Sequence, residues 1–252
     1  MKFGLIGHPI AHSLSPALFK AGYDGRFPYD LIETPDFGQA FQRFLTGYDG
    51  INVTAPFKEE ALKKADIISE ECRLVGATNL LVKTEEGIKA HNSDYLGLRL
   101  WLEQIPKDAS SVLVVGAGGA GKAAAAAARS AGLETTVINR TRYSEDVKPL
   151  SGFRKEFRKA DIVIYNLPVR IPELDTLTEE DFTPEKAKHI LEANYRDPSF
   201  DKELIQKMQQ ANQAATYTEG RVWLLLQAVT GYEILTGEAP DESAMKEIIN
   251  SK

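Results

Sequence analysis

The feature that most constrains this chain is a glycine-rich turn that lies between two β-branched runs within residues 111–141. The apolar run Val112 to Val115 leads into the turn, an alanine-rich segment follows from Lys122 to Ala131, and a second run spans Thr135 to Ile138. Strand, glycine turn, helix and strand within about thirty residues is the context in which a GxGxxG pattern indicates dinucleotide binding. The alternative that stays open is a glycine-rich turn that binds no ligand.

The turn residues favour a phosphate ligand for separate physical reasons. Gly116 lets the chain leave the strand tightly, Gly118 leaves space for a pyrophosphate, and Gly121 lets the helix lie close to the sheet. The free N–H groups of the first helical turn attract an anion. A P-loop is excluded, because Lys122 lacks the required spacing and is followed by Ala123. The predicted contacts are Gly116, Gly118, Gly119, Ala120 and Gly121.

The end of the second strand predicts which dinucleotide binds. An NAD site usually places Asp or Glu about twenty residues beyond the glycines, to accept from the ribose 2′-hydroxyl. Here the chain reads Asn139, Arg140, Thr141 and Arg142. A guanidinium suits a 2′-phosphate, which a carboxylate would repel. We therefore predict NADP, with Arg140 as the main contact, Asn139 and Thr141 as polar contacts and Arg142 as a second basic contact, although solvated arginines in a loop are an alternative.

Composition narrows the possible partners. The 252 residues carry a formal net charge of −6 without a basic run, so we expect no nucleic-acid binding. No apolar run reaches the length of about eighteen residues that a membrane helix needs. The single cysteine, Cys72, excludes an internal disulfide and agrees with a reducing cytoplasm, and we expect it to serve in packing. We predict a cytoplasmic monomer or homodimer that binds a small molecule and no metal.

Outside this unit the sequence predicts further strands, helices and loops. We expect strands at 2–7, 27–34, 51–53, 161–167 and 189–195, a hairpin at 80–83 and 88–90 followed by a loop to residue 98, and helices at 35–44, 221–235 and 241–249. The connection 141–160 is short for a crossover helix plus a strand, so part of the second half should be trimmed. In the helix at 221–235 we expect core packing for Val222, Leu225, Leu226 and Val229.

Several loop residues have both a structural and a functional interpretation. Ser13 and Ser15 can be ordinary turn or N-cap residues. Lys58 stands where a helix begins, a poor place for a cation beside the helix dipole, so either a function or simple solvation explains it. Asn79 and Asp94 flank the hairpin, and nothing in the composition establishes that they meet.

Seven segments, in order and over nearly the whole length, resemble the shikimate dehydrogenase family. They are GHPIAHSLSP near the start, NVTAPFKEEAL at 52–62, GATNLL at 76–81, HNSDYLG at 91–97, VVGAGGAGKAA at 114–124, NRT at 139–141 and EGRVWLLLQA at 219–228. The resemblance implies an α/β fold with a Rossmann-type cofactor domain at 99–219. It also implies a smaller, discontinuous α/β substrate-binding catalytic domain at 1–98 plus 220–252.

The resemblance also implies residue roles. In that family a Lys and an Asp act on the reacting oxygen, two serines hold a carboxylate, and Asn, Asp and Gln side chains bind ring hydroxyls. Carried over position by position, the catalytic pair is Lys58, the proton shuttle, and Asp94, its orienter. The substrate-binding residues are Ser13, Ser15, Thr54, Asn79, Tyr195 and Gln227, and Gly220 joins the cofactor contacts.

The implied reaction is NADP-dependent, reversible reduction of 3-dehydroshikimate to shikimate, a step of chorismate and aromatic amino acid biosynthesis. The chain departs from the family pattern at 166–169, at 192–195 and at Trp223, which replaces a Met near the nicotinamide. These departures bear on cofactor preference more than on the type of reaction. The alternatives are a quinate/shikimate or aminoshikimate dehydrogenase using NAD or NADP, and a shikimate- or nucleotide-binding sensor without catalysis.

Overall fold

The computed structural model describes residues 1–141, 144–182 and 187–251. The chain divides into two compact units. The first unit contains Met1–Gly97 and Leu224–Lys252, and the second unit contains Leu98–Trp223. Among the described residues, no helix is long and apolar enough to cross a membrane.

The first unit is built on a six-stranded mixed sheet with the order β2-β1-β3-β5-β6-β4. Strand β1 pairs in parallel with β2 and β3, whereas β5 runs antiparallel to β3 and β6. The predicted hairpin is present, with Thr84 paired to Gly87 at its tip. The strands are β1 (Phe3–Gly7), β2 (Tyr29–Glu33), β3 (Gly50–Val53), β4 (Ile67–Ile68), β5 (Leu80–Thr84) and β6 (Gly87–His91).

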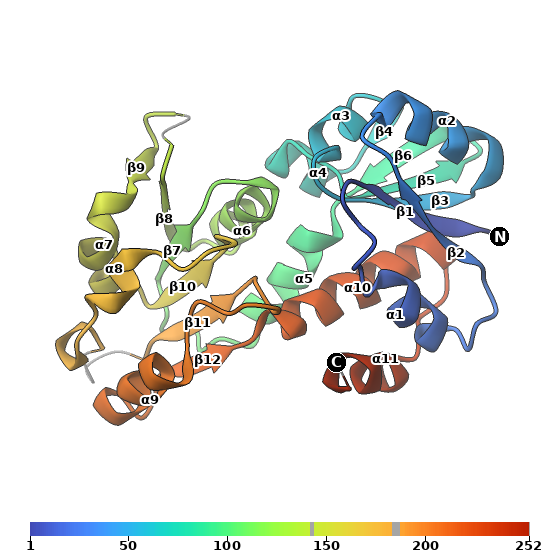
Figure 1. Ribbon diagram of the computed structural model, residues 1–252. Helices are drawn as coiled ribbons and strands as arrows, with labels where there is room; N and C mark the ends of the chain where they lie inside the picture. The colour runs from blue at the N-terminus through green and yellow to red at the C-terminus, as the bar shows by residue number, and fades with distance from the viewer. Residues whose placement is uncertain (142–143, 183–186, 252) are drawn as a thin grey trace. The chain divides into compact units, whose positions relative to one another are not determined.

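Helices cover both faces of this sheet, as Figure 1 shows. Helix α2 (Phe37–Gly47) lies on one face with α3 (Lys58–Leu62) and α4 (Glu70–Val75). On the other face α1 (Ser15–Gly22) packs beside α11 (Glu242–Asn250) and α10 (Gly220–Thr236). Helix α2 begins where expected, because the Asp36 side chain accepts from Gln39 N–H at 3.0 Å. Its Phe37, Phe41 and Phe44 reach the core through a helical spacing.

The second unit is a six-stranded sheet in which all neighbouring strands are parallel, in the order β12-β11-β10-β7-β8-β9. When β7 is counted as strand 1 and the sheet is read from β9, the order is 3-2-1-4-5-6, that of a dinucleotide-binding sheet. The expected Rossmann-type architecture is therefore confirmed. The strands are β7 (Ser111–Val115), β8 (Glu134–Asn139), β9 (Val147–Pro149), β10 (Ile162–Tyr165), β11 (His189–Glu192) and β12 (Thr216–Thr218).

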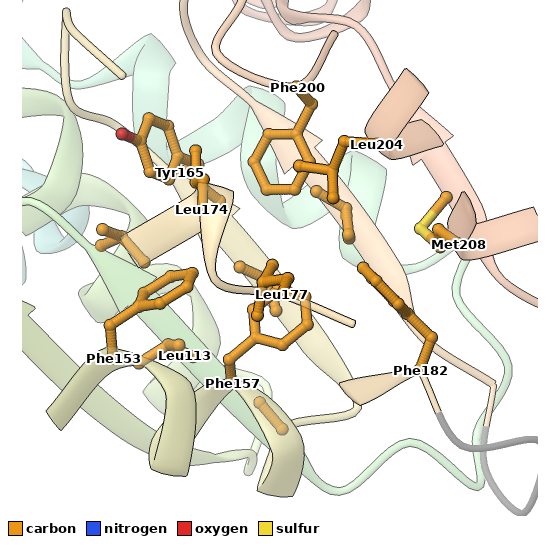
Figure 2. Close-up of a cluster of buried hydrophobic side chains, with 14 of the residues drawn as sticks. Leu113, Phe153, Phe157, Tyr165, Leu174, Leu177, Phe182, Phe200, Leu204 and Met208 are labelled. Atoms are coloured by element: carbon orange, nitrogen blue, oxygen red, sulfur yellow. The ribbon is translucent and has the colours of Figure 1, made fainter. Parts of the chain in front are cut away.

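The two faces of this sheet have different helical covers. Helix α6 (Gly119–Ser130) packs on β7 and β8, where Val114 faces it. The opposite face holds α7 (Phe153–Lys159), α8 (Pro172–Asp175) and α9 (Lys202–Ala211) over a buried apolar cluster. Figure 2 shows Phe153 and Phe157 of α7 and Leu204 of α9 among the side chains of this cluster. The alternation along β7 explains the division, because Leu113 and Val115 belong to the cluster and Val114 does not.

The 141–160 connection is short, as expected, but it shortens the first half of the 3-2-1-4-5-6 order, and the second half keeps its three strands β10, β11 and β12. Strand β9 and helix α7 both form, but they have three and seven residues. Between β8 and β9 the described residues contain no crossover helix. Strand β11 ends at Glu192, three residues before the expected end. The residues after Glu192 turn away because the Glu192 side chain bonds to the chain further on, as described below.

Two further predictions were wrong. The segment after the hairpin is not a loop: it forms α5 (Ser93–Leu102), which begins where Asn92 Oδ1 accepts from Tyr95 N–H at 3.0 Å. Val222 is not in the core but 38% exposed, because the first turn of α10 presents that side to solvent, whereas Leu225 is buried. Cys72 is buried in α4 as expected, and burial raises the pKa of its thiol to about 11.

Candidate active site

The structure brings Lys58 and Asp94 together as an ion pair in the first unit. Lys58 is the first residue of α3, and Asp94 lies in the first turn of α5. The Lys58 ammonium donates directly to Asp94 Oδ2. The side chains are 18% and 15% exposed, so the pair is screened from bulk water while one side stays open. The carboxylate compensates for the unfavourable place of a cation at a helix start.

The backbone around this pair is fixed by two connections. The Thr78 N–H donates to the Lys58 carbonyl at 3.0 Å, which ties the start of α3 to the start of β5. The Thr78 hydroxyl donates to the His91 carbonyl at 2.7 Å, which ties the same segment to the end of β6. The two elements that carry Lys58 and Asp94 are therefore held to a common segment of the sheet.

Ser13 lies on the loop between β1 and α1, Ser15 is the first residue of α1, and both are half-buried. Ser13 Oγ and Ser15 Oγ are 3.1 Å apart, and the Ser15 N–H donates to Ser13 Oγ at 3.2 Å. The Tyr232 hydroxyl donates to the Ser15 carbonyl at 3.1 Å. Burial raises the pKa of Tyr232, so its hydroxyl keeps its proton and its role as a donor. The loop thus presents two adjacent hydroxyls on a braced backbone.

Thr54 follows β3 and is half-buried. Its N–H donates to the Ile6 carbonyl at 2.9 Å, which extends the pairing of β1 and β3. A side chain on Gly7 would approach the Thr54 methyl to 2.4 Å, so the close fit of these two loops depends on that glycine.

Asn79 and Gln227 meet through a residue that the sequence analysis did not select, Ser93. The Asn79 amide bonds Ser93 twice: Asn79 Nδ2 donates to Ser93 Oγ at 3.0 Å, and Asn79 Oδ1 accepts from Ser93 N–H at 2.7 Å. Ser93 Oγ donates to Gln227 Oε1 at 3.2 Å. The available signal was the position of Ser93, directly before Asp94 in the HNSD segment. Serine is too common in turns for that position alone to indicate a role.

Tyr195 belongs to the second unit, on the half-buried part of the loop after β11. This loop is held by Glu192, which is fully buried. The carboxylate accepts from Ser199 N–H at 2.5 Å, from Phe200 N–H at 3.1 Å and from the Tyr217 hydroxyl at 2.8 Å. In the sequence Glu192 stands out only as a departure from the family pattern, and its structural role comes from these bonds.

The glycine turn after β7 has the geometry of a phosphate site. Gly116 has a φ of +99°, which disfavours residues with a side chain. A Cβ on Gly121 would lie 1.9 Å from the Gly116 carbonyl oxygen, so α6 approaches the turn as closely as backbone allows. Gly118 occupies the N-cap position of α6 and has no side chain to bond the first N–H groups of the helix. No atom lies within 4 Å of where its Cβ would be. Uncapped N–H groups and open space beside them fit a pyrophosphate.

The residues at the end of β8 connect to this turn. Asn139 is buried, and its Oδ1 accepts from Ala117 N–H at 3.4 Å while its Nδ2 donates to the Thr141 carbonyl at 2.9 Å. Arg140 and Thr141 are exposed beside it. Arg142 lies outside the described residues. The exposed guanidinium of Arg140 at the carboxyl end of β8 fits a 2′-phosphate.

A further observation lies at the point where the strand order reverses, between β7 and β10. Asn166 follows β10, and its Oδ1 atom is buried without a hydrogen-bond partner. An unpaired buried acceptor is unusual, and here it fits a ligand that brings a donor. Gly220 is the first residue of α10, and a Cβ on it would lie 2.4 Å from the Ala193 carbonyl oxygen. Trp223, in the first turn of the same helix, is buried at 5% exposure.

Both units of the chain resemble known proteins. A family model described as the shikimate dehydrogenase substrate binding domain matches residues 5–81, and one described as an FAD binding domain matches residues 111–145. The second match covers the strand, glycine turn and helix that FAD and NAD sites share. A shikimate dehydrogenase (NADP(+)) from Rubrobacter xylanophilus is 32% identical, over 99% of this chain and 95% of that protein.

Two solved structures resemble the whole chain. A shikimate 5-dehydrogenase from Thermus thermophilus, in complex with NADP(H) and shikimate, has a TM-score of 0.82 and 30% identity. The match covers 100% of this chain and 99% of the Thermus thermophilus chain. A quinate dehydrogenase from Corynebacterium glutamicum, in complex with NAD, has a TM-score of 0.82 and 25% identity, with coverage of 100% and 99%.

Proposed function

This chain belongs to the shikimate dehydrogenase family, and we propose that it catalyses the reversible, NADP-dependent reduction of 3-dehydroshikimate to shikimate. The observation that carries the proposal is the ion pair between Lys58 and Asp94. Both side chains are largely buried, yet the proton-bearing group keeps an exposed side. A sensor without catalysis has no need of such a pair.

The chemistry needs a proton at one oxygen. Reduction of a ketone leaves negative charge on its oxygen, and the reverse reaction must remove a proton from the same atom. Lys58 gives the proton to that oxygen in one direction and takes it back in the other. Asp94 holds the ammonium in place and compensates its charge. NADPH, when bound, supplies the hydride.

The remaining residues bind and orient. We propose that the adjacent hydroxyls of Ser13 and Ser15 hold the substrate carboxylate and that Thr54, Asn79, Tyr195 and Gln227 contact the ring. The uncapped start of α6 would hold the pyrophosphate, and Arg140 with Asn139 and Thr141 would hold the 2′-phosphate. The absence of an acidic residue at positions 139–141 supports NADP over NAD.

We also propose a cytoplasmic location. The only cysteine is a buried packing residue, so the fold does not depend on an oxidising compartment. The proposal includes no nucleic-acid or membrane partner, in keeping with the formal net charge of −6.

The test is substrate-dependent reduction of the nicotinamide cofactor by the purified protein. Shikimate and quinate are each offered with NADP and with NAD, and formation of NADPH or NADH is followed by absorbance. We expect the highest kcat/KM for shikimate with NADP. A higher kcat/KM for quinate or for NAD would assign the protein to the quinate-type alternative. Binding of shikimate without turnover in any combination would support the sensor and overturn the proposal.

A further inference from the structure

A buried chain of hydrogen bonds crosses the first unit at the closest approach of α5 and α10. A Cβ on Gly97 of α5 would lie 2.6 Å from the Gln227 nitrogen, and a Cβ on Gly231 of α10 would lie 2.9 Å from Ser93 Oγ. The two helices therefore meet at two glycines. Ser93 is fully buried at this crossing, with Asp94 as its neighbour in sequence.

The direction of the hydrogen bonds is determined by the backbone at both ends. If the Asn79 amide were reversed, its NH₂ group would face the Ser93 N–H, two donors at 2.7 Å. If the Gln227 amide were reversed, its oxygen would face the Leu224 carbonyl, which now accepts from Nε2 at 3.0 Å. Each amide therefore has one orientation. The single proton of the Ser93 hydroxyl then points to Gln227, and its oxygen accepts from Asn79.

The chain of bonds extends away from the crossing as well. Asn52 Nδ2 donates to the Asn79 carbonyl at 3.5 Å, and the Tyr29 hydroxyl donates to Asn52 Oδ1 at 2.8 Å. Burial raises the pKa of Tyr29 well above its usual range, so the hydroxyl remains a donor. Both the side chain and the main chain of Asn79 are thus held from within the fold.

We propose that Ser93 is a positioning residue for substrate recognition, whose hydroxyl joins Asn79 to Gln227 and holds the two amides in place relative to each other. The proposal rests on the proposed function, in which these two amides contact the ring of shikimate. The backbone sets which way each amide faces, and the Ser93 hydroxyl joins the two amides, so that each side chain keeps its second N–H and a second oxygen lone pair for the ligand. A ligand hydroxyl can therefore bond to both amides without first reorienting either, and preorganisation of this kind raises affinity.

The first test compares Ser93→Ala with Ser93→Thr. Ser93→Ala removes the donor to Gln227 and the acceptor for Asn79, and a lost bond at a buried polar group corresponds to about a tenfold to hundredfold change in an equilibrium constant. We expect the Kd of shikimate, measured calorimetrically without cofactor, and the KM of shikimate to rise by about this factor. The KM of NADP should be unchanged and kcat should stay within about threefold, less than a proton-transfer residue contributes. Ser93→Thr keeps the hydroxyl and should restore the wild-type Kd.

A second variant reaches the same hydroxyl from the opposite helix. Gly231→Ala places a methyl group 2.9 Å from Ser93 Oγ, too close for an ordinary contact, so the hydroxyl must shift. This variant should raise the Kd of shikimate although Ser93 itself is intact. The matched control is Thr230→Ala, which removes a hydroxyl of the same helix that donates to the carbonyls of Leu226 and Gln227, at 3.0 and 3.2 Å. The control should leave the Kd at the wild-type value.

The outcomes separate the two proposals. If the wild-type protein binds no shikimate, the proposed function fails, whatever Ser93 does. If the wild type binds shikimate and folded Ser93→Ala binds it equally well, the positioning role is wrong. If Ser93→Ala does not fold, the other two variants decide. An unchanged Kd of shikimate in Gly231→Ala contradicts the proposal. A Kd in folded Ser93→Thr that is raised by the factor expected for Ser93→Ala also contradicts it.

Discussion

Replacement of Lys58 by methionine is the most direct test of the proposed chemistry. Methionine keeps an unbranched side chain of similar length but has no proton to give. A general acid or base contributes about 10² to 10⁴ in rate, so kcat should fall by about that factor, equivalent to about 3 to 5 kcal/mol on the barrier. The KM of shikimate should change much less, because Asn79, Gln227 and the serine loop keep their contacts.

The structure also predicts the accompanying loss of stability. Breaking a fully buried ion pair costs about 3 to 5 kcal/mol, whereas an exposed pair contributes about 0 to 1 kcal/mol. The Lys58 and Asp94 side chains are 18% and 15% exposed, so we expect an intermediate loss, about 2 kcal/mol. A domain with about 5 to 15 kcal/mol of stability stays folded after such a loss, so the fall in kcat cannot come from unfolding.

The assay is steady-state turnover of shikimate with NADP, together with urea unfolding of each variant. Lys63→Met is the matched control, because Lys63 is exposed at the other end of α3. It should leave kcat and stability unchanged. The double variant Lys58→Met/Asp94→Asn removes both charges and should regain stability without regaining activity. A kcat for Lys58→Met within about threefold of wild type would refute the assignment of Lys58 as the proton donor.

Three further predictions concern the second unit. Arg140→Ala should weaken NADP binding by about tenfold or more while NAD binding stays the same, and equal losses for both cofactors in a fluorescence titration would argue against a 2′-phosphate contact. Gly118→Val should fill the open space beside the start of α6 and abolish binding of both cofactors with little change in thermal stability; a wild-type Kd would place the phosphates elsewhere. Burial alone would raise the pKa of Asp181, but hydrogen bonds from Arg154, the Thr178 N–H and Arg158 lower it to about 2 from 3.8, so the carboxylate stabilises the fold by about 2 kcal/mol above pH 4. This stability is lost as the pH falls toward 2, and Asp181→Asn should unfold about 2 kcal/mol more easily at neutral pH but no more easily than wild type near pH 2, as urea titrations at the two values would show.

The local part of this architecture could be predicted from the sequence. The glycine turn between Val115 and Lys122 indicated a strand and a helix because glycine, alanine and β-branched residues have strong and different backbone preferences. Asp36 and the phenylalanines after it indicated α2 for a similar reason. The family resemblance then selected Lys58 and Asp94, and the structure joins them.

What the sequence could not indicate depends on contacts between distant segments. The expected loop after the hairpin is α5, and Gly97 in its middle lowers the local helix preference. That glycine is required by a residue far along the chain, because a Cβ there would lie 2.6 Å from the Gln227 nitrogen. The local sequence indicates the unfavourable helix propensity of Gly97, but it does not indicate the packing against Gln227 that compensates for it.

The same crossing of α5 and α10 explains why one short segment serves three residues of the proposed site, Lys58, Asn79 and Gln227. Asn92 begins α5, Ser93 bonds to Asn79 and Gln227, and Asp94 holds Lys58. Three consecutive residues therefore fix a helix start, a pair of amides and an ion pair. Because α10 reaches Ser93 only where Gly97 and Gly231 remove the side chains between the helices, affinity for shikimate should depend on these glycines as strongly as on the residues that contact the ligand.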